Sequence, residues 1–193
     1  MDRYPPLELV EFLRALDGEL ARPTRITVIG GAAIGLVYDS THATTDIDLV
    51  PVGDPDFWAA VGRASRAVER PVRVSSVVIF AAPYSYEDRL IRLELPGLLE
   101  LAVEVPEAHD LALMKVARGE SHDLAAVEDM HRVHALDLET LVGRYWETLT
   151  QVTGSLDDFR LGFLALVERL FGEATAIEVA TRLHTARPPP IRS

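Results

Sequence analysis

The sequence predicts an α/β (α+β) fold in which helices flank a mixed sheet, with a helical region toward the C-terminus. Short runs rich in β-branched residues precede Pro106, and glycine, proline or aspartate bounds most of them. After Pro106 the apolar residues recur at the three-and-four spacing of amphipathic helices. With 48% hydrophobic and 25% charged residues in 193, the composition is that of a globular protein with a real core.

The first expected elements are a helix, a strand and a second helix. Leucines at helical spacing predict a helix over residues 6–21. The run ITVIGG, residues 26–31, is rich in β-branched residues and ends in two glycines, after which residues 32–38 resume helical composition. A strand, a tight glycine turn and a helix are therefore expected in succession.

The run DIDLVPV, residues 46–52, alternates in polarity and predicts a further strand. Because successive side chains of a strand point to opposite faces, we expect Asp46 and Asp48 on one face and Ile47 and Leu49 on the other. The remaining expected elements are a helix over 54–68, a β-rich run over 72–82, strands over 89–95 and 98–105, and helices over 107–118, 122–136, 138–152 and 156–172.

The charge balance limits the partners of the chain. Thirty acidic residues against 19 Lys and Arg give a net charge of −11, which argues against an extended, sequence-independent grip on nucleic acid. It leaves room for a local basic patch. The chain has no cysteine, which excludes disulfides and thiolate metal sites. Since no signal-peptide pattern and no run of about 18 apolar residues is present, we expect a cytoplasmic protein without a membrane span.

Asp46 and Asp48 are the strongest candidates for chemistry. Two carboxylates two positions apart on a strand repel each other unless a cation lies between them. Mg²⁺ accepts one or two carboxylates and keeps coordination sites for substrate phosphates, as phosphoryl and nucleotidyl transfer require. The alternative for such a pair is a solvated strand face.

Gly30 and Gly31 make the interpretation more specific. They close a strand and open a helix, where backbone N–H groups can approach phosphate oxygens without a Cβ in the way. The surrounding sequence matches neither a P-loop nor a dinucleotide-binding fingerprint. The alternative is a plain tight turn. Followed by TDID at residues 45–48, the two glycines instead indicate a nucleotide site beside a metal pair.

The combination of GGAA with ATTDID resembles the motifs of the DNA polymerase β-like nucleotidyltransferase superfamily. The resemblance covers roughly residues 25–135. Within the superfamily, the sequence resembles the small bacterial nucleotidyltransferases related to the AbiEii toxins. The matching segments are residues 30–33, 43–48, 86–90 (YEDRL), 110–115 (DLALMK) and 122–129 (HDLAAVED).

This resemblance implies a minimal nucleotidyltransferase core with helices behind it, expected over residues 1–135. From pattern and composition we expect a helical region over 136–185 and a disordered tail over 186–193. It also implies transfer of a nucleoside monophosphate from an NTP to an acceptor hydroxyl, dependent on Mg²⁺ or Mn²⁺. In such relatives the acceptor is often tRNA, with protein as another possibility, and a cognate antitoxin restrains the enzyme.

Residue by residue, Asp46 and Asp48 match the metal pair. The positions expected at the nucleotide are Gly30, Gly31, Thr44, Thr45, Lys115 and Asp123. For Lys115, which matches a triphosphate-contacting lysine, the alternative is a side chain that extends to solvent. For Asp123 the alternative is capping of a helix N-terminus.

The sequence departs from the relatives at two positions near the carboxylate pair. His42 stands where relatives usually carry arginine. The run VRVSSVVIF also lacks the third acid that the superfamily usually places on a strand facing the pair. Asp88 is the first candidate for that acid, with Glu87 and Glu94 as the others.

The sequence leaves open the roles of two arginine clusters and two alternative functions of the chain. Arginines at positions 63, 66, 70 and 73, and at 89 and 92, could steer an anionic acceptor or form solvated surfaces. The chain could instead be a nucleotide-binding or regulatory module with weak turnover. It could also be an antitoxin-type interaction protein whose carboxylates are merely solvated.

Overall fold

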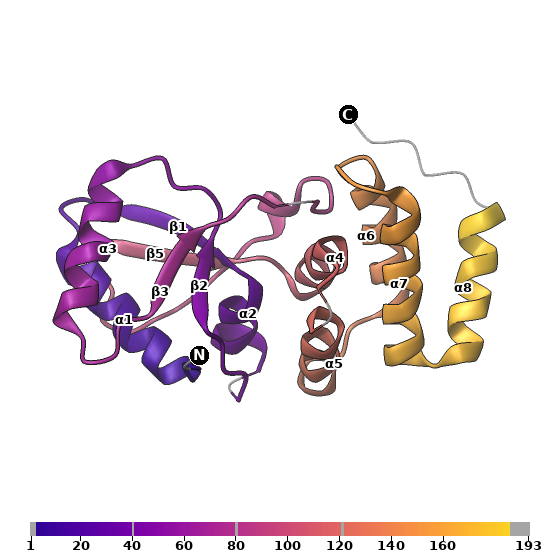
Figure 1. Ribbon diagram of the computed structural model, residues 1–193, viewed down its shortest axis with the longest axis horizontal. Coiled ribbons are helices and arrows are strands. Elements are labelled where there is room, and N and C mark those ends of the chain that lie inside the picture. The colour runs from indigo at the N-terminus through magenta and orange to yellow at the C-terminus, as the bar shows by residue number, and fades with distance from the viewer. Residues whose placement is uncertain (1–2, 40, 80, 121, 186–193) are drawn as a thin grey trace. The chain divides into compact units, whose positions relative to one another are not determined.

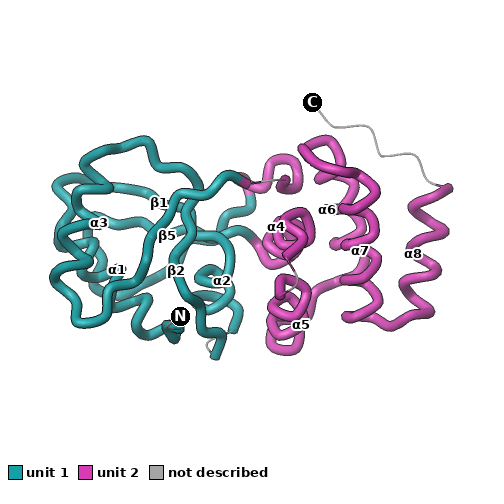
Figure 2. Tube along the Cα trace, in the orientation of Figure 1, with its two compact units in different colours: residues 1–78, 89–106 teal, residues 79–88, 107–193 magenta. Residues whose placement is uncertain are grey.

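The computed structural model describes residues 3–39, 41–79, 81–120 and 122–185, and the tail expected to be disordered, residues 186–193, lies outside them. The chain divides into two compact units (Figure 2). Unit 1 comprises Met1–Val78 and Arg89–Pro106, and unit 2 comprises Ile79–Asp88 and Glu107–Ser193. Residues 79–88 therefore belong to unit 2, although the segments on both sides of them belong to unit 1.

Unit 1 contains all five strands of the part of the chain that the structure describes (Figure 1). Its elements in chain order are α1 (Pro6–Glu19), β1 (Thr24–Ile29), α2 (Gly30–Ala33), the π-helical turn η1 (Ile34–Tyr38), β2 (Asp46–Leu49), α3 (Pro55–Ala67), β3 (Arg73–Ser76), β4 (Ile91–Arg92) and β5 (Leu101–Val105). The predicted succession of strand, glycine turn and helix is thus realised as β1 followed by α2.

The strands form one mixed sheet in the order β3-β2-β1-β5-β4. Strand β1 pairs with β5 in parallel and with β2 antiparallel, while β3 runs parallel to β2 and β4 antiparallel to β5. A mixed sheet with helices confirms the α/β prediction. Because β1 lies at the centre, the residues that follow its end are next to the middle of the sheet.

The two faces of this sheet differ in polarity. On one face the side chains are almost fully buried, since Ile26, Val28, Ile47, Leu49 and Val103 are each at most 2% exposed. Helix α1 packs against β5 and against α3 in the same unit. The opposite face carries the polar residues of the alternating strands. The hydrophobic effect therefore decides which way β2 faces.

Strand β3 is shorter than the expected run over residues 72–82. It is an edge strand whose only partner is β2, and the amide of Val77 donates its last hydrogen bond to the carbonyl of Leu49 (3.0 Å). Two residues later β2 reaches Pro51, which has no N–H to donate. Pairing ends there, so the β-branched residues after Val77 do not continue the strand.

Unit 2 is helical. Its elements are the 3₁₀ turn η2 (Tyr86–Arg89, whose last residue belongs to unit 1) and helices α4 (Ala108–Arg118), α5 (Asp123–Val133), α6 (Leu138–Leu149), α7 (Leu156–Phe171) and α8 (Glu173–Thr185). Helix α4 is buried from Ala108 to Val116 and packs against α5, α6 and α7. No helix among the described residues is long and apolar enough to span a bilayer.

Helix α8 lies within the helical region expected over residues 136–185, although the apolar pattern predicts no separate helix after residue 172. Half of its apolar positions are alanines, and Val179 is its one buried residue in the described part of the chain. It packs against α7, and Arg182 makes two hydrogen bonds of 2.7 Å to Glu139 of α6. Such a weak apolar stripe gives little periodic signal, so packing on α7 rather than its own pattern explains the helix.

The carboxylate of Asp17, near the end of α1, holds the beginning of β5. It accepts hydrogen bonds from three consecutive backbone amides, those of Leu99, Glu100 and Leu101, at 2.7–3.1 Å. Asp17 is only 7% exposed. One anionic side chain therefore satisfies three donors of a loop and ties the N-terminal helix to the sheet.

We expect Asp17→Ala to lower the free energy of unfolding by about 2–4 kcal/mol, because it leaves three amides without their acceptor. Urea denaturation of purified protein measures this change. Glu11→Ala, an exposed position on the same helix, serves as the control and should stay within about 0.5 kcal/mol of wild type. Similar losses in both variants would contradict the role assigned to Asp17.

Candidate functional site

Asp46 and Asp48 lie on the polar face of the unit 1 sheet. Along β2 the burial alternates, so both aspartates are half-buried while Ile47 and Leu49 are buried on the other face. The apolar face fixes this orientation, because a shift of one residue would bury both carboxylates. The pair is thus held on one face by the packing behind it.

Gly30 is required by the approach of Asp48. Antiparallel pairing places Ile29, the last residue of β1, opposite Asp48. The next residue, Gly30, has a positive φ of 70°, and a Cβ there would lie 3.3 Å from Oδ2 of Asp48. Any other residue would combine backbone strain with a tight contact to this carboxylate.

Gly31 is required by the loop that leads into β2. A Cβ on Gly31 would lie 2.6 Å from Oγ1 of Thr44 and 3.4 Å from Nε2 of His42. One turn later, a Cβ on Gly35 would lie 2.7 Å from the carbonyl oxygen of His42. The glycines at both positions therefore let this short helical segment pack directly against the loop.

The loop itself is held by polar contacts. The buried Thr44 exchanges two backbone hydrogen bonds with Tyr4, at 2.7 and 3.1 Å. The carboxylate of Asp39 accepts hydrogen bonds from the hydroxyl (2.6 Å) and amide (2.9 Å) of Thr41. The hydroxyl contact is the main cause that lowers the pKa of Asp39 below its usual value. Thr45 is half-buried and directly precedes β2.

Ser75 is the one residue of β3 that contacts the aspartate pair through a described hydrogen bond. It lies opposite Asp48 in the parallel pairing of β2 and β3, and its Oγ donates to Oδ1 of Asp48 at 2.8 Å. No sequence motif surrounds Ser75, and the register of the two strands cannot be derived from the sequence, so this contact was not predicted. The strand on which the superfamily usually places a third acid supplies a hydroxyl here.

The other expected acids do not complete a cluster. Among the residues that the structure describes, no group of three or more His, Asp or Glu side chains is arranged to hold a metal ion. Glu87 and Asp88 are exposed on the turn η2, within the segment of unit 2, and Glu94 is exposed after β4 in unit 1.

Lys115 and Asp123 meet inside unit 2. Nζ of Lys115 lies 2.9 Å from Oδ1 of Asp123, with the two side chains 5% and 1% exposed. Arg118 binds the same carboxylate through Nε (2.8 Å) and Nη2. The alternative that Lys115 extends to solvent is therefore wrong. Asp123 begins α5, yet its carboxylate is occupied by these two cations rather than by amides of the helix.

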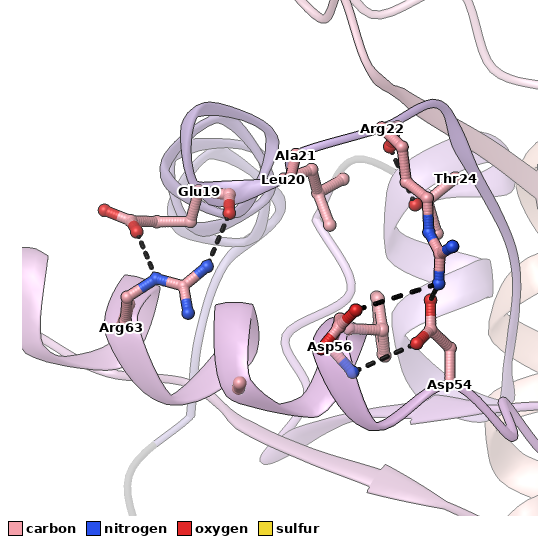
Figure 3. A pocket seen from close by; sticks show the side chains of 10 residues that line it. Glu19, Leu20, Ala21, Arg22, Thr24, Asp54, Asp56 and Arg63 are labelled. Carbon is pink, nitrogen blue, oxygen red and sulfur yellow. Dashed lines mark hydrogen bonds and ion pairs between the residues drawn. The ribbon is translucent and has the colours of Figure 1, made fainter.

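Unit 1 also has a hollow of about 350 Å³ that the aspartate pair does not line (Figure 3). It includes Thr24, at the opposite end of β1 from Gly30, and two ion pairs line it. Arg63 binds Glu19 at 2.6 Å, and Arg22 binds Asp54 at 2.7 Å. Because its charged groups bind one another, this hollow offers no obvious ligand site, and the polar face at β2 remains the candidate.

Comparison with known proteins identifies one family. The model of the family described as "Nucleotidyltransferase of unknown function (DUF6036)" matches residues 7–169. Neither a curated protein nor a solved structure matches the chain. The family match includes the glycine turn, the β2 carboxylates and the Lys115–Asp123 pair.

Gly31→Ala is expected to lower the free energy of unfolding by about 1–3 kcal/mol, because the new methyl group overlaps Oγ1 of Thr44. Adding Thr44→Ala removes the nearest atom and should recover part of this loss in urea denaturation. Gly53→Ala is the control, since a Cβ there meets no atom within 4 Å. Equal urea midpoints for Gly31→Ala and wild type would contradict the prediction, because the loop would then accommodate the methyl group without loss of stability.

The Asp123 cluster predicts a pH dependence of stability. Burial raises the pKa of Asp123, but the hydrogen bonds and charges of Arg118 and Lys115 outweigh burial and hold it below the usual value. A depressed pKa stabilises the fold above the unfolded-state value of about 3.9 and loses that contribution as pH falls through the folded-state value. Wild type should therefore lose stability below about pH 4.

Asp123→Asn should be less stable than wild type at pH 7 by about 3–5 kcal/mol, since the buried Lys115 and the part-buried Arg118 lose their ion pair with this carboxylate. Its further loss between pH 5 and pH 2 should be smaller than that of wild type, as measured by thermal unfolding across that range. Asp157→Asn, at an 82% exposed side chain on α7, should keep the wild-type acid profile. Parallel profiles for Asp123→Asn and wild type would contradict the prediction.

Proposed function

The chain belongs to this DUF6036 family of nucleotidyltransferases, and we propose that it transfers a nucleoside monophosphate from an NTP to an acceptor hydroxyl. The observation that carries the proposal is the position of Asp46 and Asp48 on the open polar face, directly beside the glycine turn after β1. Carboxylates for a cation and amides for phosphates are the two components that nucleotidyl transfer needs.

The donor set fits a divalent cation. Asp46 and Asp48 present hard oxygen donors from the same strand face. Mg²⁺ is usually bound by one or two carboxylates plus substrate phosphates, and Mn²⁺ suits the same donors. When bound, such a cation neutralises phosphate charge and lowers the pKa of the attacking hydroxyl. We propose that Asp46 and Asp48 hold it through their carboxylate oxygens.

The nucleotide is proposed to lie against the turn. The amides of Gly30 and Gly31 would donate to the triphosphate, and Thr44 and Thr45 would border it from the adjoining loop. The oxygen of the acceptor hydroxyl bonds to the α-phosphorus while the bond from that phosphorus to the bridging oxygen breaks. Pyrophosphate leaves, and the hydroxyl proton passes to water.

Two residues of unit 2 are proposed for supporting roles. Lys115 is a candidate for binding phosphate, and Asp123 is its positioning residue, because Asp123 fixes the ammonium group within 2.9 Å. Asp88 remains the proposed third carboxylate.

We propose tRNA or a protein as the acceptor, and the arginines of unit 1 favour tRNA. Arg63 and Arg70 are bound to Glu19 and Glu8 of α1. By contrast, Arg73 on β3 and Arg92 on β4 are exposed, and neither side chain makes a hydrogen bond or ion pair within the described part of the chain. Both lie on strands of the sheet that carries the aspartates, where free guanidinium groups suit phosphates.

A narrower version of the proposal is that the enzyme is the toxin of a toxin–antitoxin pair, restrained in the cytoplasm by a cognate antitoxin. It rests on the resemblance of the DLALMK and HDLAAVED segments to AbiEii relatives. Co-purification of a neighbouring gene product that suppresses transfer would support it.

The second candidate function is a nucleotide-binding or regulatory module with weak turnover. It is favoured by Ser75, because the residue opposite Asp48 on the neighbouring strand is a hydroxyl rather than an acid. Such a module would bind an NTP with a divalent cation but form no product.

Asp46→Asn and Asp48→Asn should each reduce transfer by about 100-fold or more, because each removes a charge that holds the cation. The assay incubates protein, Mg²⁺ and each NTP radiolabelled at the α-phosphate with total RNA, total protein or no acceptor. Glu11→Gln, exposed on α1, is the control variant, and Asp88→Asn tests the third carboxylate.

Label moved by wild type and Glu11→Gln, but not by the two Asn variants, would establish the enzyme and its acceptor class. Saturable NTP binding without transfer, lost in Asp48→Asn, would select the binding module. Full transfer by either Asn variant would contradict the proposed site.

A further inference from the structure

The side chain of Asp48 is oriented by its hydrogen bond with Ser75. Its Oδ1 accepts from Oγ of Ser75 at 2.8 Å, and its Oδ2 lies on the side of Gly30, 3.3 Å from where a Cβ would be. The hydrogen bond restricts rotation of the carboxylate about its χ angles. Oδ2 is therefore directed toward the turn that follows β1.

Strand register makes this contact specific. Ser75 is the position of β3 directly opposite Asp48, whereas Ser76, the next residue, is exposed on the alternate face and pairs with Leu49. An acid in place of Ser75 would repel Asp48 unless a cation were present. Serine instead donates a hydrogen bond to Oδ1 of the carboxylate without adding a second negative charge.

We propose that Ser75 is a positioning residue for the divalent cation. It fixes Asp48 through Oδ1 so that Oδ2 remains available as a ligand beside Gly30. This inference rests on the proposed function, since it concerns the same carboxylate pair. It differs from a role in folding, because the hydroxyl acts on the orientation of a ligand rather than on the core.

The two-carboxylate site then has a defined consequence for affinity. Groups that orient a metal ligand through a hydrogen bond typically contribute about 10–100-fold to metal affinity. An ordered carboxylate also loses less conformational entropy on binding than a mobile one. Removal of the Ser75 hydroxyl should therefore weaken cation binding without unfolding the protein.

The experiment compares Ser75→Thr with Ser75→Val, two β-branched residues of nearly equal shape that suit a strand and differ by the hydroxyl. The probe is Mn²⁺ alone, without nucleotide, and its dissociation constant is measured by electron paramagnetic resonance of the free ion. Ser76→Val is the matched control on the opposite face. Thermal unfolding without metal confirms that every variant is folded.

We expect Ser75→Thr and Ser76→Val to bind Mn²⁺ within about 3-fold of wild type, and Ser75→Val to bind about 10-fold more weakly. Equal affinities for Ser75→Thr and Ser75→Val, an equal loss in Ser76→Val, or absence of Mn²⁺ binding by wild type would each overturn the inference.

A third substitution, Ser75→Asp, is expected to make the melting temperature depend more strongly on Mn²⁺. Ser75→Asp creates three neighbouring carboxylates, so its melting temperature should fall without metal and recover as Mn²⁺ is added, more than in wild type. A Ser75→Asp protein insensitive to Mn²⁺ would also overturn the inference.

The outcomes separate this inference from the proposed function. If Mn²⁺ binding depends on the Ser75 hydroxyl and on Asp48 but no acceptor receives label, the transferase proposal fails and the positioning role stands. If wild type transfers label and the Thr and Val variants bind Mn²⁺ equally, the function stands and the positioning role fails.

Discussion

The antiparallel register between β1 and β2 is the constraint on which the candidate site depends. It sets Ile29 opposite Asp48, so the residue that follows β1 must be a glycine with a positive φ. The same register brings the loop before β2 against Gly31, where Thr44 occupies the space of a Cβ. Apolar packing behind β2 selects this register, because a slip of one residue would bury two carboxylates and expose Ile47 and Leu49.

The carboxylates on β2 and the carboxylate of Asp123 differ in the groups that bind them. On the β2 face the carboxylates are half-buried, and Asp48 is held by a neutral hydroxyl, which leaves its negative charge uncompensated by that contact. In unit 2 the buried carboxylate of Asp123 is bound by two cations. A half-buried carboxylate with a neutral hydrogen-bond donor can bind a cation, whereas a buried group with two cationic partners holds helices α4 and α5 together. This contrast is why the first arrangement is a candidate ligand site.

Local pattern predicted the elements that carry strong periodicity. The alternation of DIDL placed both aspartates on one face, and two glycines after a β-branched run placed a turn between β1 and α2, as the structure has them. Other features could not be predicted from the sequence, because they depend on contacts between distant segments. The partner of Asp48 depends on the register of β3, the end of β3 depends on Pro51 in β2's continuation, and the burial of Lys115 depends on an acid eight positions later. Helix α8 gives only a weak periodic signal, because half of its apolar positions are alanines.

The discontinuous composition of unit 1 affects how the protein is made on the ribosome. Strand β1 is central, yet its parallel neighbour β5 emerges only after residues 79–88, which belong to the other unit, have been synthesised. Until then the nascent sheet presents one unpaired edge of an apolar strand, a template for wrong pairing between chains. The amides that Asp17 binds emerge at the same late moment. A ribosome that stalls before Leu101 therefore displays an N-terminal fragment with an incomplete sheet, which chaperones and proteases can bind.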